Sequence, residues 1–192
     1  MIESVVRLQD RIKVKMCLIT GSLFACMSPV LAVDKTWNGG TGNWDTAANW
    51  SPASEPAAAD RVFINNGGTV QVNTVADVSQ ALTLGSGAGN SGTLAIFGGG
   101  QLTSGAAVNL GLGAGATGTA TIDGAGSFWR INNALVVGNA GTGTINITNG
   151  GLLYTATGSA ISIGNPGGST GTITVDGTGS TLRGNTPTNN TA

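Results

Sequence analysis

The sequence predicts an all-β protein, a parallel β-solenoid of about four 26-residue coils, and three observations carry this prediction. First, a signature of aliphatic, any residue, aliphatic and glycine occurs four times, and its terminal glycines, Gly85, Gly111, Gly138 and Gly164, are almost evenly spaced. Second, each unit offers only about six inward apolar side chains, too few for a core of its own, so copies must stack with their equivalent strands parallel. Third, only 9% of residues are charged, against roughly 25% in soluble globular domains, which favours folding by turns and stacking over long helices.

Residues 1–32 have a different composition, which predicts a signal peptide helix. Four basic residues precede an uncharged apolar run, and Val30-Leu31-Ala32 fits the pattern of a secretory cleavage site between Ala32 and Val33. The protein is therefore expected to cross the inner membrane and to reside in the periplasm, at the cell surface or in the medium. Two alternatives stay open: an uncleaved anchor, and lipidation at Cys26, where the sequence loosely resembles a bacterial lipobox.

The composition after residue 32 excludes several chemistries. The chain has no histidine, and both cysteines (Cys17 and Cys26) lie in the predicted leader, so the remainder has no thiol and no disulfide. Four basic and seven acidic residues give this remainder a net charge of 4 − 7 = −3. So few cations do not favour a nucleic-acid partner, because phosphate contacts dominate such affinity. We predict no cofactor, no metal site and no enzymatic activity.

Residues 33–60 are predicted to form an irregular, tryptophan-rich N-terminal cap without a persistent strand or helix pattern. Trp37, Trp44 and Trp50 lie close to one another in this segment. We interpret them as an apolar plug, because aromatic side chains bury large areas and the first coil of a stack needs a cover. The alternative interpretation is a sugar-stacking surface.

Residues 61–183 are predicted to form the solenoid. The chain enters it as a strand at 61–64, a turn at 65–68 and a strand at 69–73. In each later coil the signature strand is followed by a second strand that opens with Gly-Thr, and then by a shorter third strand. The second strands are expected at 92–96, 118–122, 143–147 and 171–175, and the third strands enter with Leu102, Trp129, Leu152 and Leu182. Residues 184–192 are expected to form a disordered polar tail.

A longer repeat is superimposed on the coils. The segment Gly118–Arg130 recurs as Gly171–Arg183, two coils later in the chain. The corner Asp123–Ser127 matches the corner Asp176–Ser180, whereas the intervening coils have glycine-rich corners of another kind. Odd and even coils are therefore predicted to alternate.

These repeats resemble a known class of exported proteins. The stretches GTATIDGAGSFWRINNALVVGNAGTGTINITNGG and IGNPGGSTGTITVDGTGSTL, with the opening TWNGGTGNWDTAANWSPASEP, are similar to passenger domains of bacterial autotransporters (type V secretion) and PEP-CTERM-associated proteins. The resemblance implies a right-handed parallel β-helix, displayed on or released from a Gram-negative cell surface. It also implies a following outer-membrane barrel. The sequence shows no such series of strands, so we expect a truncated passenger segment.

The predicted function is that of a non-catalytic, adhesin-like or structural β-solenoid. Cell-surface or extracellular glycans, or a host surface, are the expected partners, and the open last coil predicts end-to-end self-association. The outward residues Thr121, Asn146 and Thr174 are predicted to form one polar row on the second strands. This row is interpreted as a solvated face, with a sugar-binding or ice-binding surface as the alternative.

A carbohydrate-active β-helix enzyme, either a polysaccharide hydrolase or a lyase, is the alternative function. Its remote catalytic candidates are Asp123 and Asp176, because equivalent corners two coils apart would lie roughly 9.5 Å from each other, near the upper limit for inverting glycosidases. Asp-Gly pairs are also the ordinary composition of tight turns, and we prefer that interpretation.

Two strings of residues mimic catalytic motifs without their context. Gly113-x-Gly115-x-x-Gly118 matches a dinucleotide fingerprint, and Gly167-x-Ser169-x-Gly171 matches a nucleophile elbow. A strand is predicted after each, where a helix would be required, and no histidine is present to act as a base. A disordered glycine-rich linker is a third interpretation of the whole segment.

Overall fold

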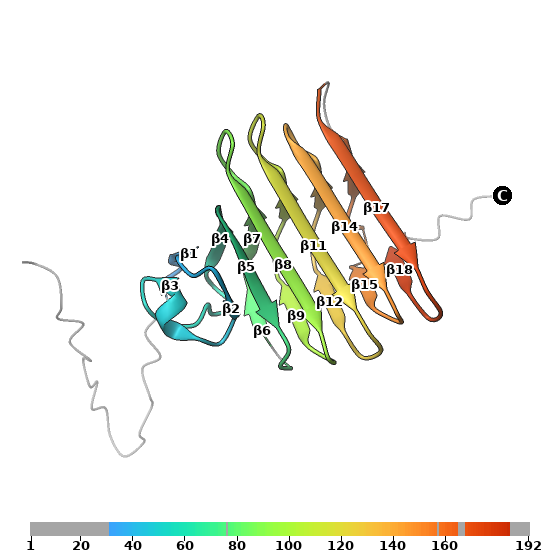
Figure 1. Ribbon diagram of the computed structural model, residues 1–192, viewed down its shortest axis with the longest axis horizontal. Coiled ribbons are helices and arrows are strands. Elements are labelled where there is room, and N and C mark those ends of the chain that lie inside the picture. Colours follow the sequence, from blue (N-terminus) through green and yellow to red (C-terminus); the bar gives the residue numbers. More distant parts are fainter. Residues whose placement is uncertain (1–30, 76, 157, 165–167, 185–192) are drawn as a thin grey trace, which may run out of the picture. The chain divides into compact units, whose positions relative to one another are not determined.

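The computed structural model describes residues 31–75, 77–156, 158–164 and 168–184, and within them the protein is a parallel β-solenoid (Figure 1). The predicted all-β fold of stacked parallel coils is confirmed, which contradicts the interpretation as a disordered linker. The right-handed course of the coils stays a prediction. Most of the predicted signal peptide, including Cys26, lies outside the described residues, as does the tail from residue 185.

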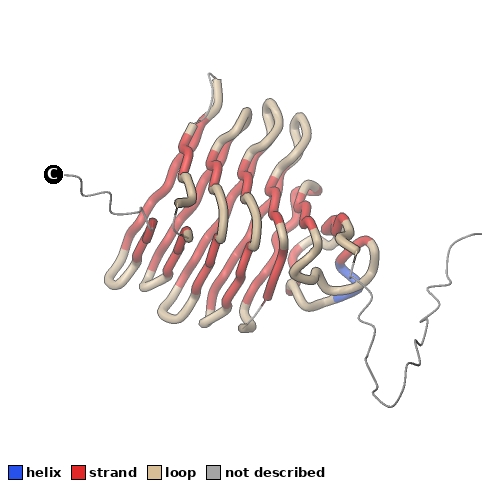
Figure 2. Tube along the Cα trace, turned by 180° about the vertical axis from the view of Figure 1, so that it is seen from behind, coloured by secondary structure: helices blue, strands red, loops and turns tan. Residues whose placement is uncertain are grey.

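Three sheets, which we call A, B and C, run along the stack (Figure 2). Sheet A contains β1 (Asp34–Trp37), β3 (Trp50–Ser51), β4 (Arg61–Ile64), β7 (Ala81–Leu84), β10 (Val108–Leu110), β13 (Leu135–Val137) and β16 (Ile161–Ile163). Sheet B contains β2 (Thr41–Asn43), β5 (Asn66–Val72), β8 (Ser91–Phe97), β11 (Thr117–Asp123), β14 (Thr142–Thr148) and β17 (Thr170–Asp176). Sheet C contains β6 (Asp77–Ser79), β9 (Gln101–Ser104), β12 (Phe128–Ile131), β15 (Leu152–Thr155) and β18 (Thr181–Gly184).

Successive strands pass from sheet A to B to C, so each group of three strands is one coil. The described residues form five complete coils, preceded by a partial coil of β1 and β2. The expected number of about four was too low. The additional complete coil, β4 to β6, departs from the repeat period. Fewer residues separate Val62 from its partner Leu82 than the predicted 26-residue period requires. The number of residues between Leu82 and its partner Val108 matches that period.

The third strands show one error of alignment. In sheet C, Trp129 pairs with Leu102 and Leu153, and Leu153 pairs with Leu182. Leu153 is fully buried, whereas Leu152 is half-buried on the outer face. The sequence therefore placed the inward position one residue too early in this coil, because two adjacent leucines give no period-two signal.

The tryptophan plug is confirmed, although the cap contains more strand than expected. Trp37, Trp44 and Trp50 are at most 1% exposed, and Trp50 makes edge-to-face contacts with both others, at centroid distances of 4.9 and 5.2 Å. Strands β1 and β2 pair in register with β4 and β5, and the short helix η1 (Ala47–Asn49) leads into the antiparallel strand β3. The cap therefore continues the stack and also closes it.

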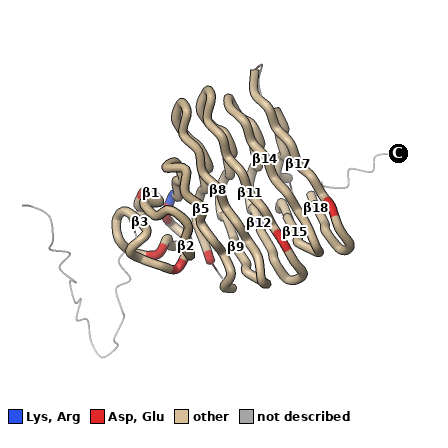
Figure 3. Tube along the Cα trace, viewed as in Figure 1, with Lys and Arg blue, Asp and Glu red and all other residues tan. Residues whose placement is uncertain are grey.

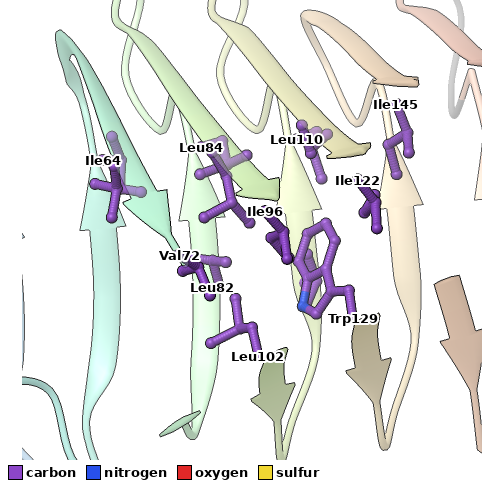
Figure 4. Packing of buried hydrophobic residues seen from close by; sticks show 14 of the residues in the cluster. Ile64, Val72, Leu82, Leu84, Ile96, Leu102, Leu110, Ile122, Trp129 and Ile145 are labelled. Carbon is purple, nitrogen blue, oxygen red and sulfur yellow. The ribbon is translucent and has the colours of Figure 1, made fainter. Parts of the chain in front are cut away.

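The core is a set of apolar columns along the stack, one residue from each coil (Figure 4). In sheet B the column Val70, Leu94, Ala120, Ile145 and Ile173 lies next to the column Val72, Ile96, Ile122, Ile147 and Val175. Each fully buried aliphatic side chain contributes about 1.5–3 kcal/mol. Ile173 is only partly buried and Val175 is 45% exposed, because no described coil covers the last one.

Glycines serve two different purposes at the corner between sheets A and B. The glycines of the aliphatic signature, such as Gly111, have positive φ angles. Close approach also requires glycine here, since a Cβ atom on Gly111 would lie 2.4 Å from the Thr142 carbonyl oxygen. The glycines that open the second strands are needed for close approach alone, since a Cβ atom on Gly118 would lie 2.5 Å from the Leu84 carbonyl oxygen and 2.8 Å from the Gly111 amide nitrogen. Backbone atoms at these distances have no room to move away.

We predict that Gly118→Ala lowers the free energy of unfolding by about 3 kcal/mol, because the added methyl group overpacks a corner made of backbone. Urea unfolding followed by tryptophan fluorescence measures the change. Gly105→Ala is the matched control, because the nearest atom to its Cβ is 3.6 Å away and its φ is not positive. Equal midpoints for the two variants would contradict the close-approach explanation.

Candidate functional site

The two carboxylates singled out in the sequence lie at equivalent corners. Asp123 ends β11 and Asp176 ends β17, and both pair in register with Thr148 of the coil between them. Two strand spacings put their Cα atoms roughly 9.5 Å apart, as expected for stacked coils. The sequence therefore predicted their juxtaposition correctly, and their side chains decide what this juxtaposition means.

The Asp123 carboxylate is occupied by the next coil. Its Oδ1 accepts hydrogen bonds from Thr148 Oγ1 at 2.7 Å and from Asn149 Nδ2 at 2.6 Å. These two hydrogen bonds stabilise the charged form and lower the pKa of Asp123, first through Thr148 and then through Asn149. A general acid for glycoside hydrolysis needs the opposite, a raised pKa. Asp176 accepts a hydrogen bond from the Gly177 amide of its own turn.

The same corners explain the alternation of the coils. Ser127 Oγ donates to the Asp123 carbonyl, which closes its own turn, and accepts from the Gly99 amide of the preceding coil. Ser180 Oγ repeats both contacts with the Asp176 carbonyl and the Gly150 amide. Each Asp-to-Ser corner is thus clamped onto a glycine-rich corner, and the two-coil repeat has a structural cause.

The two motif-like strings have the context that the sequence predicted. Gly113 and Gly115 lie in a turn, and Gly118 is inside strand β11, so no helix N-terminus faces a phosphate site there. Ser169 directly precedes strand β17, and Gly167 lies outside the described residues. The described residues contain no cluster of three or more potential metal ligands.

None of the four tryptophans offers a free ring. Trp129 is as deeply buried as the three cap tryptophans, and its Nε1 donates to Ser104 Oγ inside the solenoid at 3.2 Å. Trp50 Nε1 donates to the Trp44 carbonyl, and Trp37 Nε1 donates to the Gly40 carbonyl. The sugar-stacking interpretation of the cap is therefore wrong for these side chains.

The outer face of sheet B carries an in-register array of hydroxyl groups. The predicted row of Thr121, Asn146 and Thr174 is confirmed by the strand register. The adjacent and more regular row was not predicted, because Gly-Thr indicated only the opening of a strand. This second row consists of Thr41, Thr69, Thr93, Thr119, Thr144 and Thr172. We call the two rows the threonine face.

The threonine face is regular and uncharged. Neighbours along a row are about 4.8 Å apart, and adjacent rows are separated by about 6.7 Å, twice the rise per residue. Charged residues are sparse over the stacked strands and gather near the cap (Figure 3). Such a face can offer hydroxyl and methyl groups at fixed positions without a net electrostatic field.

The cap engages the two cations nearest to it. Lys35, one of the four basic residues after residue 32, is only 3% exposed, and its Nζ donates to the Pro52 carbonyl at 2.9 Å and to Ser54 Oγ. Arg61 forms an ion pair with Asp34 at 2.7 Å. The alternation of strand β1 places Lys35 on the inner face, a position that the irregular cap pattern did not reveal.

Asp77 is a buried carboxylate at the first position of sheet C. It is 4% exposed and pairs in register with the core residue Leu102. Its pKa is raised to about 6, chiefly by burial; the hydrogen bonds from Thr74 Oγ1 at 3.3 and 3.4 Å oppose this rise, and the charges of Glu55 and Asp45 add to it. Its charged form therefore destabilises the cap end of the stack.

Ala32 and Val33, the residues on either side of the predicted cleavage site, are both exposed. No helix among the described residues is long and apolar enough to span a membrane. Comparison with known proteins finds no matching family model, no matching curated protein and no matching solved structure.

We predict that the protein loses stability as the pH rises from about 4 to about 6.5. The folded chain holds the Asp77 proton more tightly than the unfolded chain, so this contribution is present below the unfolded pKa of 3.8 and is lost through the folded value of about 6. Asp77→Asn should remove this slope and gain roughly 1–2 kcal/mol at pH 8.

Urea midpoints measured at intervals of pH test the prediction. Thr74→Val should shift the loss of stability to higher pH, because it removes the hydrogen bond that lowers the Asp77 pKa. An Asp77→Asn variant with the same pH slope as the parent chain would show that another group is responsible.

Proposed function

We propose that this protein is a non-catalytic, exported β-solenoid that serves surface display, adhesion or extracellular structure, in the manner of an autotransporter passenger segment. The threonine face is the observation that carries the proposal. A rigid array of neutral hydroxyl groups suits multivalent contact with an extended surface.

The proposed location depends on the leader. Four basic residues, an apolar run and a small-residue cleavage pattern support export across the inner membrane. Val33 is held by the cap, because its amide donates to Asp60 Oδ1 at 3.0 Å and its carbonyl accepts from the Arg61 amide at 3.0 Å. Removal of residues 1–32 would therefore leave the cap intact.

End-to-end association is part of the same proposal. The inward residues of the last described coil are incompletely covered, with Ile163 51% and Val175 45% exposed. The tryptophan plug closes the opposite end, so the association would join two ends that carry β16, β17 and β18. Such pairing adds main-chain hydrogen bonds along three strand edges at once.

We predict that the full chain, expressed in a Gram-negative host, yields an exported product that begins at Val33. Intact mass spectrometry of the periplasmic, surface and medium fractions identifies its N-terminus. Ala32→Arg should retain the leader, since a small residue is needed before the cleavage site. A cytoplasmic, full-length product would contradict the proposal. A lipidated chain that begins at Cys26 would contradict cleavage after Ala32 and would show that the protein is anchored to a membrane by its lipid.

We predict that the purified protein releases no reducing ends or unsaturated sugars from pectin, alginate or β-glucan. The lowered pKa of Asp123 and its two hydrogen bonds to the next coil leave it unsuited to act as an acid. A reducing-sugar assay and an absorbance assay for unsaturated products measure cleavage. Product release that disappears in Asp123→Asn would establish the enzymatic alternative.

A further inference from the structure

The outer face of sheet C carries an aligned row of two arginines and a tyrosine. Arg130 pairs in register with Tyr154, and Tyr154 pairs with Arg183, so the three residues occupy consecutive coils. Tyr154 is the single tyrosine of the chain. Strand spacing places the Cα atoms of the two arginines about 9.6 Å apart, with the tyrosine midway between them.

Among the described cations, the two arginines are the ones that can pair with an external anion. Of the four cations after the leader, Lys35 is buried in the cap and Arg61 is paired with Asp34. Arg130 and Arg183 are exposed, and neither forms an ion pair within the described residues. A guanidinium group without a carboxylate partner keeps a forked set of donors that matches a carboxylate in two hydrogen bonds.

The row is also held in shape. The guanidinium carbon of Arg130 lies 5.4 Å from the centroid of the Tyr154 ring, and Arg130 Nε donates to Asn132 Oδ1 at 2.7 Å. These contacts fix the arginine beside the ring and leave its terminal nitrogens to an external ligand. Two half-buried apolar residues, Phe128 and Leu152, form the adjacent row of the same face.

The outward residues of strands β9, β12, β15 and β18 include no acidic residue. They are Gln101, Thr103, Phe128, Arg130, Leu152, Tyr154, Thr181 and Arg183. The nearest carboxylates before strands β12 and β18 in the sequence, Asp123 and Asp176, end strands of sheet B, where Asp123 is held by Thr148 and Asn149 and Asp176 by the Gly177 amide. This face is therefore locally positive, although the segment as a whole is negative.

We infer that this face binds a linear carboxylated polysaccharide, a chain of uronate sugars that runs along the stack. One pyranose ring would pack against the part of the Tyr154 ring that the Arg130 guanidinium leaves uncovered, and the carboxylates of the sugars on either side would pair with Arg130 and Arg183. A sugar residue is about as long as one strand spacing, so consecutive sugars fall on consecutive coils. Bidentate pairing with planar carboxylates is the interaction for which arginine is best suited.

The observations favour this ligand over the other polymers of the cell exterior. Neutral glucans would leave both guanidinium groups without partners, and nucleic acids gain affinity from many phosphate contacts where this face offers two. The biological setting of the inference rests on the exported, displayed role proposed above. Binding itself is a property of the purified chain and is measured independently of export.

The test uses the purified full chain and unesterified homogalacturonan, with its methyl-esterified form as the uncharged comparison. Isothermal titration calorimetry at low and at moderate salt should show binding to the unesterified polymer alone, weakened by salt. Arg130→Gln and Arg183→Gln should each reduce the affinity roughly tenfold or more, as expected for loss of one charge-assisted pair. Tyr154→Phe should retain binding and Tyr154→Ser should lose most of it.

Arg61→Gln is the matched control, because it removes an equal charge from the cap and should leave the affinity unchanged. Circular dichroism of each variant establishes that the β-solenoid is intact. Equal affinities of the folded Arg130→Gln, Arg183→Gln and parent chains would overturn the inference, as would absence of binding or equal binding of both polymers. Binding that favours a sulfated glycan over homogalacturonan would also overturn it. None of these outcomes affects the cleavage and processing results, which decide the proposed function separately.

Discussion

The structure depends on one constraint: a coil of this protein cannot bury its own apolar side chains. Each coil contributes a few inward residues, and they become a core only when the backbones of successive coils pair in register, which aligns like residues into columns. The parallel ladder therefore comes first, and packing, capping and surface pattern follow from it. At the start of the stack, where a preceding coil would lie, three tryptophans provide the cover.

The periodic parts of the fold could be predicted from the sequence, and the parts that break the period could not. The glycine signature located β7, β10, β13 and β16 because the same corner recurs with the same close approach. The coil β4 to β6 is shorter and places Asp77 where later coils place a core residue, so the sequence indicated its first two strands but not its third. Lys35 was missed for a related reason, since its burial depends on Pro52 and Ser54 from a distant part of the cap.

The candidate sites show the same division. The register of Asp123 and Asp176 followed from the repeat, but their role follows from Thr148 and Asn149, whose hydrogen bonds only the folded corner shows. The sequence shows the Gly-Thr pairs that supply one row of the threonine face, but only the strand register shows that these threonines align on the outer face. The sequence did not predict the row that contains Arg130, Tyr154 and Arg183. The third strands are short, and the adjacent Leu152 and Leu153 left their register ambiguous.

The serine clamps also restrict how such a stack can lengthen. Ser127 and Ser180 each reach back to a glycine-rich corner, so a corner of one kind always fits onto a corner of the other. Duplication of a single coil would place two corners of the same kind next to each other. Either a serine hydroxyl or a glycine amide would then lack the partner of the hydrogen bond that joins successive corners. Duplication of two coils preserves every clamp. Gene segments that encode a pair of coils are therefore the smallest increments by which this architecture grows or shrinks without a defect.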